Sequence, residues 1–272
     1  MQFVDKAFAR RLESGEEMPQ VFYAQVFQKT RPEVGAVWEA ICGGHMSFCG
    51  LGSPVGRAVA LGLDRPFTAA DLDRVEAFYH AHQAPAQLDL CPMHEPAVFE
   101  MFRQRGYGIA ELNNVLYRRL EAGEIFPAPP PGCEIRRARM DEAEASGAIV
   151  ESAFFPDGAP EAFGGLIAPF YSIEQALAFV ASSEGMLVAC GTGLILRDHK
   201  VFALCGAGTL AEYRGRGLQT ALLRARMAAA AAAGCEYAVV VTQGGTTSQR
   251  NAERLGFRVA YSKVTVIKEL SG

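Results

Sequence analysis

The spacing of apolar and polar residues predicts a regular alternation of strands and helices in the second half of the chain. Residues 133–138 ("CEIRRA") fit a short strand. A helix is expected to follow, capped by Asp141 with Glu144 three residues on as in a capping box, and running to about Phe155. Residues 185–211 are rich in Val, Leu and Cys and predict strands with a turn at positions 198 and 199.

A longer helix is expected next, ending at Gly234, which suits a C-terminal cap. One face of it is predicted to hold Leu218, Ala221, Leu222, Ala225, Ala229 and Ala232. Residues 236–243 ("EYAVVVTQ") form a near-continuous apolar run, as expected of a central strand. A short helix over 246–256 and a closing strand over 257–270 complete the order β-α-β-β-β-α-β-α-β. This order predicts a mixed α/β sheet.

A proline-rich segment divides the chain. Residues 121–133 ("EAGEIFPAPPPGC") contain four prolines, which cannot continue a helix or a central strand and favour a stiff spacer. We therefore expect a front domain over 1–120, a linker over 121–133 and a rear domain over 134–272. Each part has an ordinary domain size.

The two parts share a pattern. Residues 105–120 ("RGYGIAELNNVLYRRL") align without a gap with residues 255–270 ("LGFRVAYSKVTVIKEL"), so that Gly106 pairs with Gly256 at a constant offset of 150. The identities are few, and chance similarity is the alternative. The shared order of elements favours an internal duplication.

Composition and charge restrict the class of protein. Half of the residues are hydrophobic and 21% are charged, which suits a globular protein with a full core. The net charge of −4 disfavours a nucleic-acid partner. The N-terminal residues are too charged for a secretory signal, and no apolar run is long enough to span a membrane. Seven cysteines, an odd number, favour reduced thiols and hence a cytoplasmic protein.

The most distinctive stretch is "EYRGRGLQTALL" (212–223), which places two glycines and two arginines directly before the long helix. The first N–H groups of a helix have no partner inside the helix, and the helix dipole adds positive potential there. Glycines let a phosphate approach those donors closely. The alternative is a Gly-rich turn that only closes a strand–helix junction.

This stretch resembles the signature of the GCN5-related N-acetyltransferase (GNAT) superfamily, which is Arg or Gln, two residues, Gly, one residue, then Gly or Ala. The matching residues are Arg214, Gly215, Arg216, Gly217, Leu218 and Gln219, and Gln219 departs from the small residue usual at the end. "SQRNAERLGF" (248–257) resembles the short helix and turn that complete the family's cofactor cleft. The resemblance covers residues 134–270.

The front part resembles a degenerate GNAT copy that is truncated at its start, so the whole chain resembles the tandem-GNAT arrangement. The implied fold is α/β (α+β): two tandem domains, each a mixed, mostly antiparallel, twisted sheet flanked by helices. The offset of 150 places Asp64, Arg65, Pro66 and Phe67 over the signature of the rear part. Pro66 has no N–H, Phe67 is bulky and Asp64 repels phosphate, so the front loop should bind no cofactor. Thr68 and Asp71 are still expected to cap a helix there.

The resemblance implies acetyl-CoA as co-substrate, no metal, and direct attack by an amine on the thioester. The pyrophosphate would lie on residues 214–219, and the pantetheine and acetyl group on Ala207, Gly208 and Thr209 of the preceding strand. Asn251 would hydrogen-bond the cofactor, or else be a solvated helix residue. Gly206 and Gly208 suit a bulged strand end, the alternative being tight packing under a helix.

The position of the catalytic acid departs from the family pattern. Many relatives carry a tyrosine five residues before the Phe of the "GF" turn, but that position is Ala252 here. Ser248 is the candidate that could protonate the leaving thiolate, and its alternative role is a plain helix cap. Cys205 has no His or acid near it in sequence and is expected to be a structural cysteine. The group Cys42, His45 and Cys49 fits no standard zinc finger.

The leading hypothesis is therefore a cytoplasmic N-acetyltransferase that acts on the amine of a small molecule, with the rear domain catalytic. The alternative is a non-catalytic protein that senses acyl-CoA, because the usual tyrosine is absent. A homodimer is compatible with either. The acceptor stays open, because its pocket depends on loops such as residues 155–172.

Overall fold

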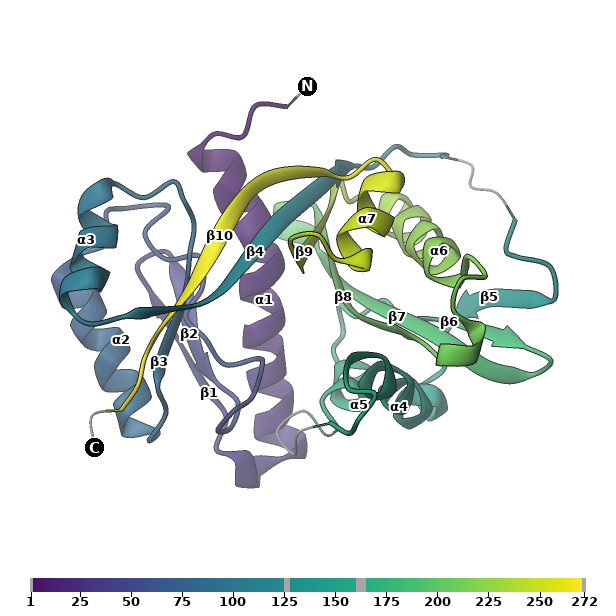
Figure 1. Cartoon of the computed structure of the whole chain (residues 1–272), viewed down its shortest axis with the longest axis horizontal. Helices are drawn as coiled ribbons and strands as arrows, with labels where there is room; N and C mark the ends of the chain where they lie inside the picture. Colours follow the sequence, from purple (N-terminus) through teal and green to yellow (C-terminus); the bar gives the residue numbers. More distant parts are fainter. Residues whose placement is uncertain (1, 125–127, 160–164, 271–272) are drawn as a thin grey trace. The chain divides into compact units, whose positions relative to one another are not determined.

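The computed structural model describes residues 2–124, 128–159 and 165–270, and the chain divides into two units (Figure 1). The first unit is Met1–Leu116 with Val241–Gln249 and Arg258–Gly272, and the second is Tyr117–Val240 with Arg250–Phe257. Pro127 of the proline segment and residues 160–164 of the 155–172 loop lie outside the described residues. No helix in the described ranges is both long and apolar enough to cross a membrane.

The first unit joins helices to an antiparallel pair formed by strands far apart in the sequence. Strand β3 pairs with β10, with Leu90 opposite Val264, and β1 pairs with β2 in a hairpin. The elements are α1 (Lys6–Thr30), β1 (Val37–Ile41), β2 (Gly44–Phe48), α2 (Ala69–Ala81), β3 (Ala86–Leu90), α3 (Pro96–Gln104), β4 (Gly108–Arg119) and β10 (Arg258–Lys268). Strand β4 passes from the first unit into the second at Leu116–Tyr117.

A buried ionic cluster lies in the first unit between α1, β3 and β10. The Lys263 ammonium is 2.9 Å from Asp89 Oδ2 and 3.8 Å from Glu13 Oε2, and all three side chains are buried. The Tyr261 hydroxyl donates to Glu13 at 2.7 Å. Burial opposes ionisation of Asp89, but Lys263 and Arg57 outweigh it and lower the pKa of this carboxyl to about 2. The cluster fixes β10 to the first unit through paired charges.

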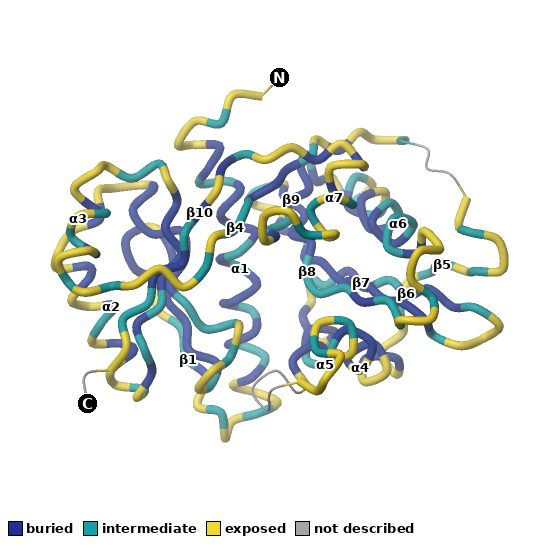
Figure 2. Tube along the Cα trace, in the orientation of Figure 1, coloured by how far each residue is buried: buried dark blue, intermediate teal, exposed yellow. Residues whose placement is uncertain are grey.

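The second unit is a mostly antiparallel sheet with helices on both faces (Figures 1 and 2). Strands β5 to β8 pair antiparallel in sequence order, and β9 pairs parallel to β8. Cys190 packs with α4 and neighbouring Gly191 lies against α6, so α4 and α6 cover opposite faces. The elements are β5 (Cys133–Arg137), α4 (Ala143–Phe154), α5 (Ile167–Phe170), β6 (Phe179–Ser183), β7 (Met186–Leu196), β8 (Val201–Thr209), α6 (Leu218–Ala232), β9 (Tyr237–Gln243) and α7 (Thr247–Arg254).

The order of elements agrees with the expectation of two related parts. At an offset close to 150, α2, β3, α3 and β4 correspond to α6, β9, α7 and β10; β4 begins at Gly108 and β10 at Arg258. In the described residues the first unit begins with helix α1 and has no counterpart of strand β5 before it. The fold is therefore of the tandem kind, and the described residues of the front copy begin at α1.

Three local expectations differ from the structure. The start of α4 is preceded by a 3-10 turn over Met140–Glu142, and Glu142, not Glu144, accepts the backbone N–H of Arg139 at 2.8 Å. Asp141 does not cap the helix, because it lies within the 3-10 turn that precedes α4. The buried residues of α6 are Leu218, Leu222, Leu223, Arg226, Met227 and Ala230, so Ala225 and Ala229 are only partly covered and Ala232 is exposed.

The third difference concerns the end of the rear domain expected over 134–272. Val264–Lys268 of β10 pair with Ala86–Leu90 of β3, and the whole strand belongs to the first unit rather than to the second. The reason is non-local: the apolar residues of β10 complete a core in which Val266 is packed with the front residues.

Candidate functional site

Strands β8 and β9 are paired over only part of their length. The parallel register joins Val201–Ala203 to Tyr237–Val239, and β8 then continues to Thr209. The parallel pairing with β9 therefore ends at Ala203 within the described part of the second unit, and Ala207–Thr209 lie beyond it. An open strand edge presents unpaired N–H and C=O groups in a row. Such an edge can bind an extended ligand that carries amides.

The loop after β8 leads directly to the start of α6. A 3-10 turn over Ala211–Tyr213 is followed by Gly215 at φ 75° and Gly217 at φ 82°, both in the left-handed region that favours glycine. Gly217 is the N-cap of α6 and provides no side-chain cap, and the first turn contains no acidic residue. The first N–H groups of α6, at Leu218 and Gln219, thus meet no capping side chain. This helix start can accept an anion.

The two arginines of the loop are exposed but tied to the loop itself. Arg214 Nε donates to the carbonyl of Thr209 at 3.2 Å, and Arg216 Nη2 donates to the carbonyl of Glu212 at 3.0 Å. The Arg216 guanidinium also lies 4.8 Å from the centre of the Tyr213 ring. Each guanidinium keeps further N–H donors for a ligand. The positive charge is therefore held close to the open end of α6.

The corresponding helix start in the first unit is closed by its own side chains. Thr68 Oγ1 accepts the N–H of Asp71 at 3.3 Å, and the Asp71 carboxylate accepts the N–H of Thr68 at 2.9 Å. Arg65 donates to both oxygens of Asp71, at 2.6 and 2.8 Å. Phe67 is buried and stacks on Phe102 with ring centres 5.8 Å apart. The predicted Thr68 cap is confirmed, and this helix start has an acidic side chain where α6 has none.

The glycines of β8 are explained by helix packing. A Cβ on Gly208 would lie 2.7 Å from the carbonyl oxygen of Ile149 and 2.9 Å from the Cα of Val150, both in α4. A Cβ on Gly206 would lie 2.9 Å from Cδ1 of Ile167. The alternative of tight packing under a helix therefore fits both positions. Their neighbours Ala207 and Thr209 are half-buried.

Helix α7 carries the remaining predicted residues, and it passes from one unit to the other. Ser248 is exposed and belongs to the first unit, whereas Asn251 is half-buried and belongs to the second. The hydroxyl of Thr246, not Ser248, accepts the N–H of Gln249 at 3.3 Å, so the role of a plain helix cap falls to Thr246. Ala252 is only 2% exposed. Asn251 therefore belongs to the same unit as the loop, and Ser248 belongs to the other unit.

Two buried polar residues of the second unit were missed by the sequence analysis. Thr192 is fully buried in β7, and Arg226 is 1% exposed in α6. Burial lowers the pKa of Arg226 to about 10. The sequence signal is the pair Arg224 and Arg226 in the otherwise apolar segment "RARMAAAAAAG" (224–234).

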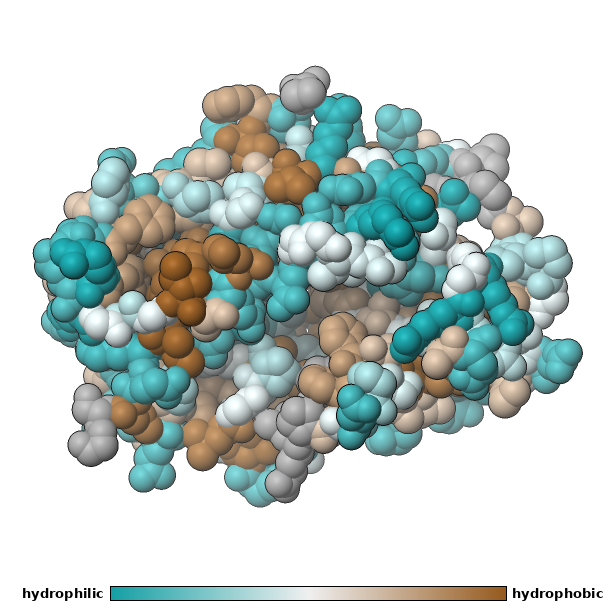
Figure 3. Space-filling model, in the orientation of Figure 1, coloured by the Kyte–Doolittle hydropathy of each residue, from teal (hydrophilic) through white to brown (hydrophobic). Residues whose placement is uncertain are grey.

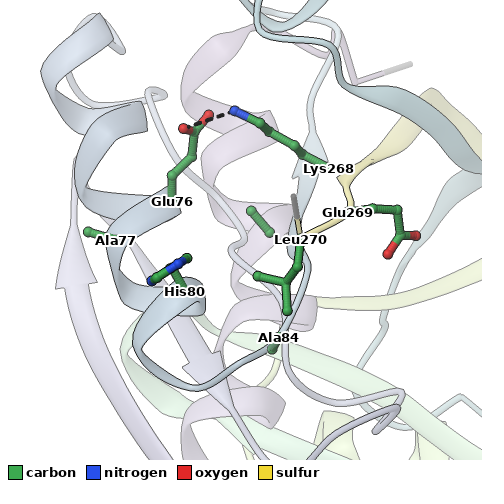
Figure 4. A pocket seen from close by; sticks show the side chains of 8 residues that line it. Glu76, Ala77, His80, Ala84, Lys268, Glu269 and Leu270 are labelled. Atoms are coloured by element: carbon green, nitrogen blue, oxygen red, sulfur yellow. Dashed lines mark hydrogen bonds and ion pairs between the residues drawn. The ribbon is translucent and has the colours of Figure 1, made fainter. Parts of the chain in front are cut away.

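The other clusters of the first unit do not join this site. His45 Nδ1 is 2.6 Å from Glu17 Oε1, and the described residues contain no group of three His, Cys, Asp or Glu side chains that could hold a metal ion. Figure 3 shows apolar side chains over β4, where Ile109 and Leu112 are 71% and 65% exposed. A pocket of about 370 Å³ contains the Lys268–Glu76 ion pair at 3.2 Å (Figure 4). None of the predicted site residues lines it; its lining is Glu76, Ala77, His80, Ala84, Ala86, Lys268, Glu269 and Leu270.

The chain is similar to known proteins over much of its length. Residues 148–257 match the model of the acetyltransferase (GNAT) family. A search of the curated proteins found no match. A GCN5-related N-acetyltransferase from Kribbella flavida is similar with a TM-score of 0.64 and 19% identity, over 92% of this chain and 96% of that one.

Two further solved structures are similar. A tandem GNAT protein from the clavulanic acid biosynthesis pathway has a TM-score of 0.64 at 11% identity, over 97% of this chain and 95% of that one. A GCN5-related N-acetyltransferase from Sphaerobacter thermophilus has a TM-score of 0.55 at 19% identity, over 74% and 65%. At these identities the likeness shows the fold. The fold is that of tandem GNAT proteins, and the family match at 148–257 supports acetyl transfer from acetyl-CoA in general.

Proposed function

We propose that the chain is an N-acetyltransferase that binds acetyl-CoA in its second unit and transfers the acetyl group to the amine of a small molecule. The observation that carries the proposal is the contrast between two helix starts. Helix α6 begins at a bare Gly217 flanked by Arg214 and Arg216, whereas α2 is closed by Thr68 and Asp71. The binding free energy of an anion is therefore far more favourable at the start of α6 than at the start of α2.

The cofactor roles are assigned to the loop and the strand before it. Residues 214–219 would hold the pyrophosphate through backbone N–H groups and the two guanidinium groups. The open edge of β8, at Ala207, Gly208 and Thr209, would bind the amides of the pantetheine arm. Asn251 would add a hydrogen bond, because its partly exposed side chain lies in the same unit.

The reaction would be a direct transfer in a ternary complex. A neutral amine attacks the thioester carbonyl, and the oxyanion is stabilised by N–H groups of β8. The C–S bond then breaks to release a thiolate, and the attacking nitrogen loses one proton to give the amide, which balances the proton that the thiolate gains. Ala252 has no proton to give to that thiolate. Ser248 is exposed and is the candidate donor. No metal takes part in the proposal.

A non-catalytic acyl-CoA sensor is the second candidate, favoured by one observation. The position that commonly carries an acid is the buried Ala252. The two functions differ in thiol release from acetyl-CoA, measured with a panel of small amines. Amine-dependent release supports the enzyme, and binding of acetyl-CoA without release for any amine supports the sensor. We further propose that the protein is cytoplasmic. We also propose that it forms a homodimer, which sedimentation would test by measuring its mass in solution.

A further inference from the structure

Strand β8 contains a bulge at the place where its open edge begins. Gly191 of β7 is opposite Ala207, and Gly193 is opposite Leu204. One residue of β7, Thr192, therefore faces two residues of β8, Cys205 and Gly206. A bulge of this kind bends the strand and redirects its backbone groups.

Thr192 holds the bulge from the opposite strand. Its hydroxyl donates to the carbonyl of Gly206 at 3.0 Å. Its own carbonyl accepts a hydrogen bond from Arg226 Nη1 at 2.7 Å. Thr192 thus contacts the bulge through its side chain and helix α6 through its backbone. A valine at this position would keep the shape and lose the contact with Gly206.

Arg226 is an unusual residue for the place it occupies. It is 1% exposed, and no carboxylate within the described chain pairs with it. Its Nε donates to the carbonyl of Leu222 at 3.2 Å, and its Nη2 has no hydrogen-bond partner among the described residues. A buried guanidinium without a carboxylate is costly. A hydrophobic residue would fill the same place at lower cost, which points to a role other than packing.

The backbone of β7 is adapted to this arginine. A Cβ on Gly191 would lie 2.6 Å from Cζ of Arg226 and 2.8 Å from its Nη2. Gly191 is not at a positive φ, so the space taken by the guanidinium is the reason for glycine there. Gly191, Thr192 and Arg226 therefore form one contiguous set of contacts between β7 and α6.

We infer that Thr192 and Arg226 are positioning residues that link the bulge of β8 to helix α6. The inference rests on the proposed function: the start of α6 holds the pyrophosphate and the edge of β8 holds the pantetheine arm and thioester. Arg226 lies eight residues after Leu218, or about 12 Å along the helix axis. The link therefore fixes the distance and angle between the two parts of the protein that grip the two ends of one ligand.

The main test compares Thr192→Val with Thr192→Ser in the full-length chain. Thr192→Val should lower kcat by about 10- to 100-fold, because the thioester is misplaced. It should also weaken acetyl-CoA several-fold while leaving the affinity for ADP, which contacts only the α6 end, unchanged. Thr192→Ser keeps the hydroxyl and should restore both values. Equal kcat and acetyl-CoA affinity in the valine variant and the wild type would overturn the inference.

A second test does not depend on turnover. Gly191→Ala alone should lower the melting temperature, since its methyl group meets Arg226. In an Arg226→Ala background the same change should have little effect. If Gly191→Ala lowers the melting temperature equally in both backgrounds, Arg226 is not the reason for glycine at position 191. The proposed link between β7 and α6 is then wrong. A wild-type chain that binds no acetyl-CoA would instead refute the proposed function itself.

Discussion

Replacing Gly217 with valine should weaken acetyl-CoA binding, through the backbone rather than through a clash. Gly217 has φ 82° and ψ 5°, a left-handed conformation that β-branched residues rarely adopt. A Cβ built there meets only Cγ of Pro130, at 3.7 Å, which is an ordinary contact. The valine therefore fits the space but strains the helix start.

The magnitude follows from two terms. The left-handed conformation costs a non-glycine residue about 1–2 kcal/mol. If the backbone moves to relieve the strain, the loop loses at least one N–H donor to a charged phosphate, worth about 1.5–3 kcal/mol. The strain lowers stability, and the lost N–H donor lowers affinity, so we expect a loss of about 2 kcal/mol in binding from the second term. This corresponds to roughly a 30-fold higher Kd.

The assay is titration calorimetry with acetyl-CoA, and α6 offers a matched control at its other end. Gly234 has φ 89° with no atom within 4 Å of a built Cβ, so Gly234→Val carries similar backbone strain. It lies just beyond the C-terminus of α6, away from the proposed phosphate site. Both variants should lose stability, and only Gly217→Val should lose affinity. If Gly217→Val binds acetyl-CoA like the wild type, the loop is not the phosphate site.

Four further outcomes are expected. Calorimetry should give one acetyl-CoA per chain, and a second site of similar affinity would mean that the closed start of α2 does not exclude the ligand. Lys263→Met should lower the free energy of unfolding by about 3–5 kcal/mol, because Asp89 and Glu13 lose their buried cation; an unchanged urea midpoint would contradict this. The pKa of Asp89 is lowered to about 2, so its ionised form adds stability that is complete above pH 4 and lost as the pH falls towards 2. Asp89→Asn should flatten that part of the acid-unfolding curve. Residues 134–272 expressed alone should be less soluble than the full chain, because β10 lacks β3; a soluble fragment with full-length kinetics would refute this.

Local features were predictable from the sequence, because the residues that make them are close together in the chain. The Thr68–Asp71 cap depends on two side chains three positions apart, and the positive φ angles at Gly215 and Gly217 follow from the residue type. The start of α4 was misplaced because acidic residues at 141, 142 and 144 are interchangeable in a pattern. Only the fold decides which carboxylate meets the free N–H.

Non-local features could not be predicted in this way. Alanine is compatible with either face of α6, and arginine is usually a surface residue. The sequence pattern therefore predicted a buried face that is rotated by one residue from the observed face, which contains Arg226. The link through Thr192 depends on a register shift between two strands. The partner of β10 is more than 160 residues away in sequence, and no pattern within residues 258–268 identifies it.

That distant pairing has a consequence for synthesis. The strand that closes the sheet of the first unit, β10, is translated after every other strand of the chain. Until then β3 has an unpaired edge, and Asp89 and Glu13 have no Lys263 to neutralise them. At ordinary translation rates this interval lasts on the order of 10 to 30 seconds. The first unit therefore cannot complete its fold until the residues of β10 have been synthesised.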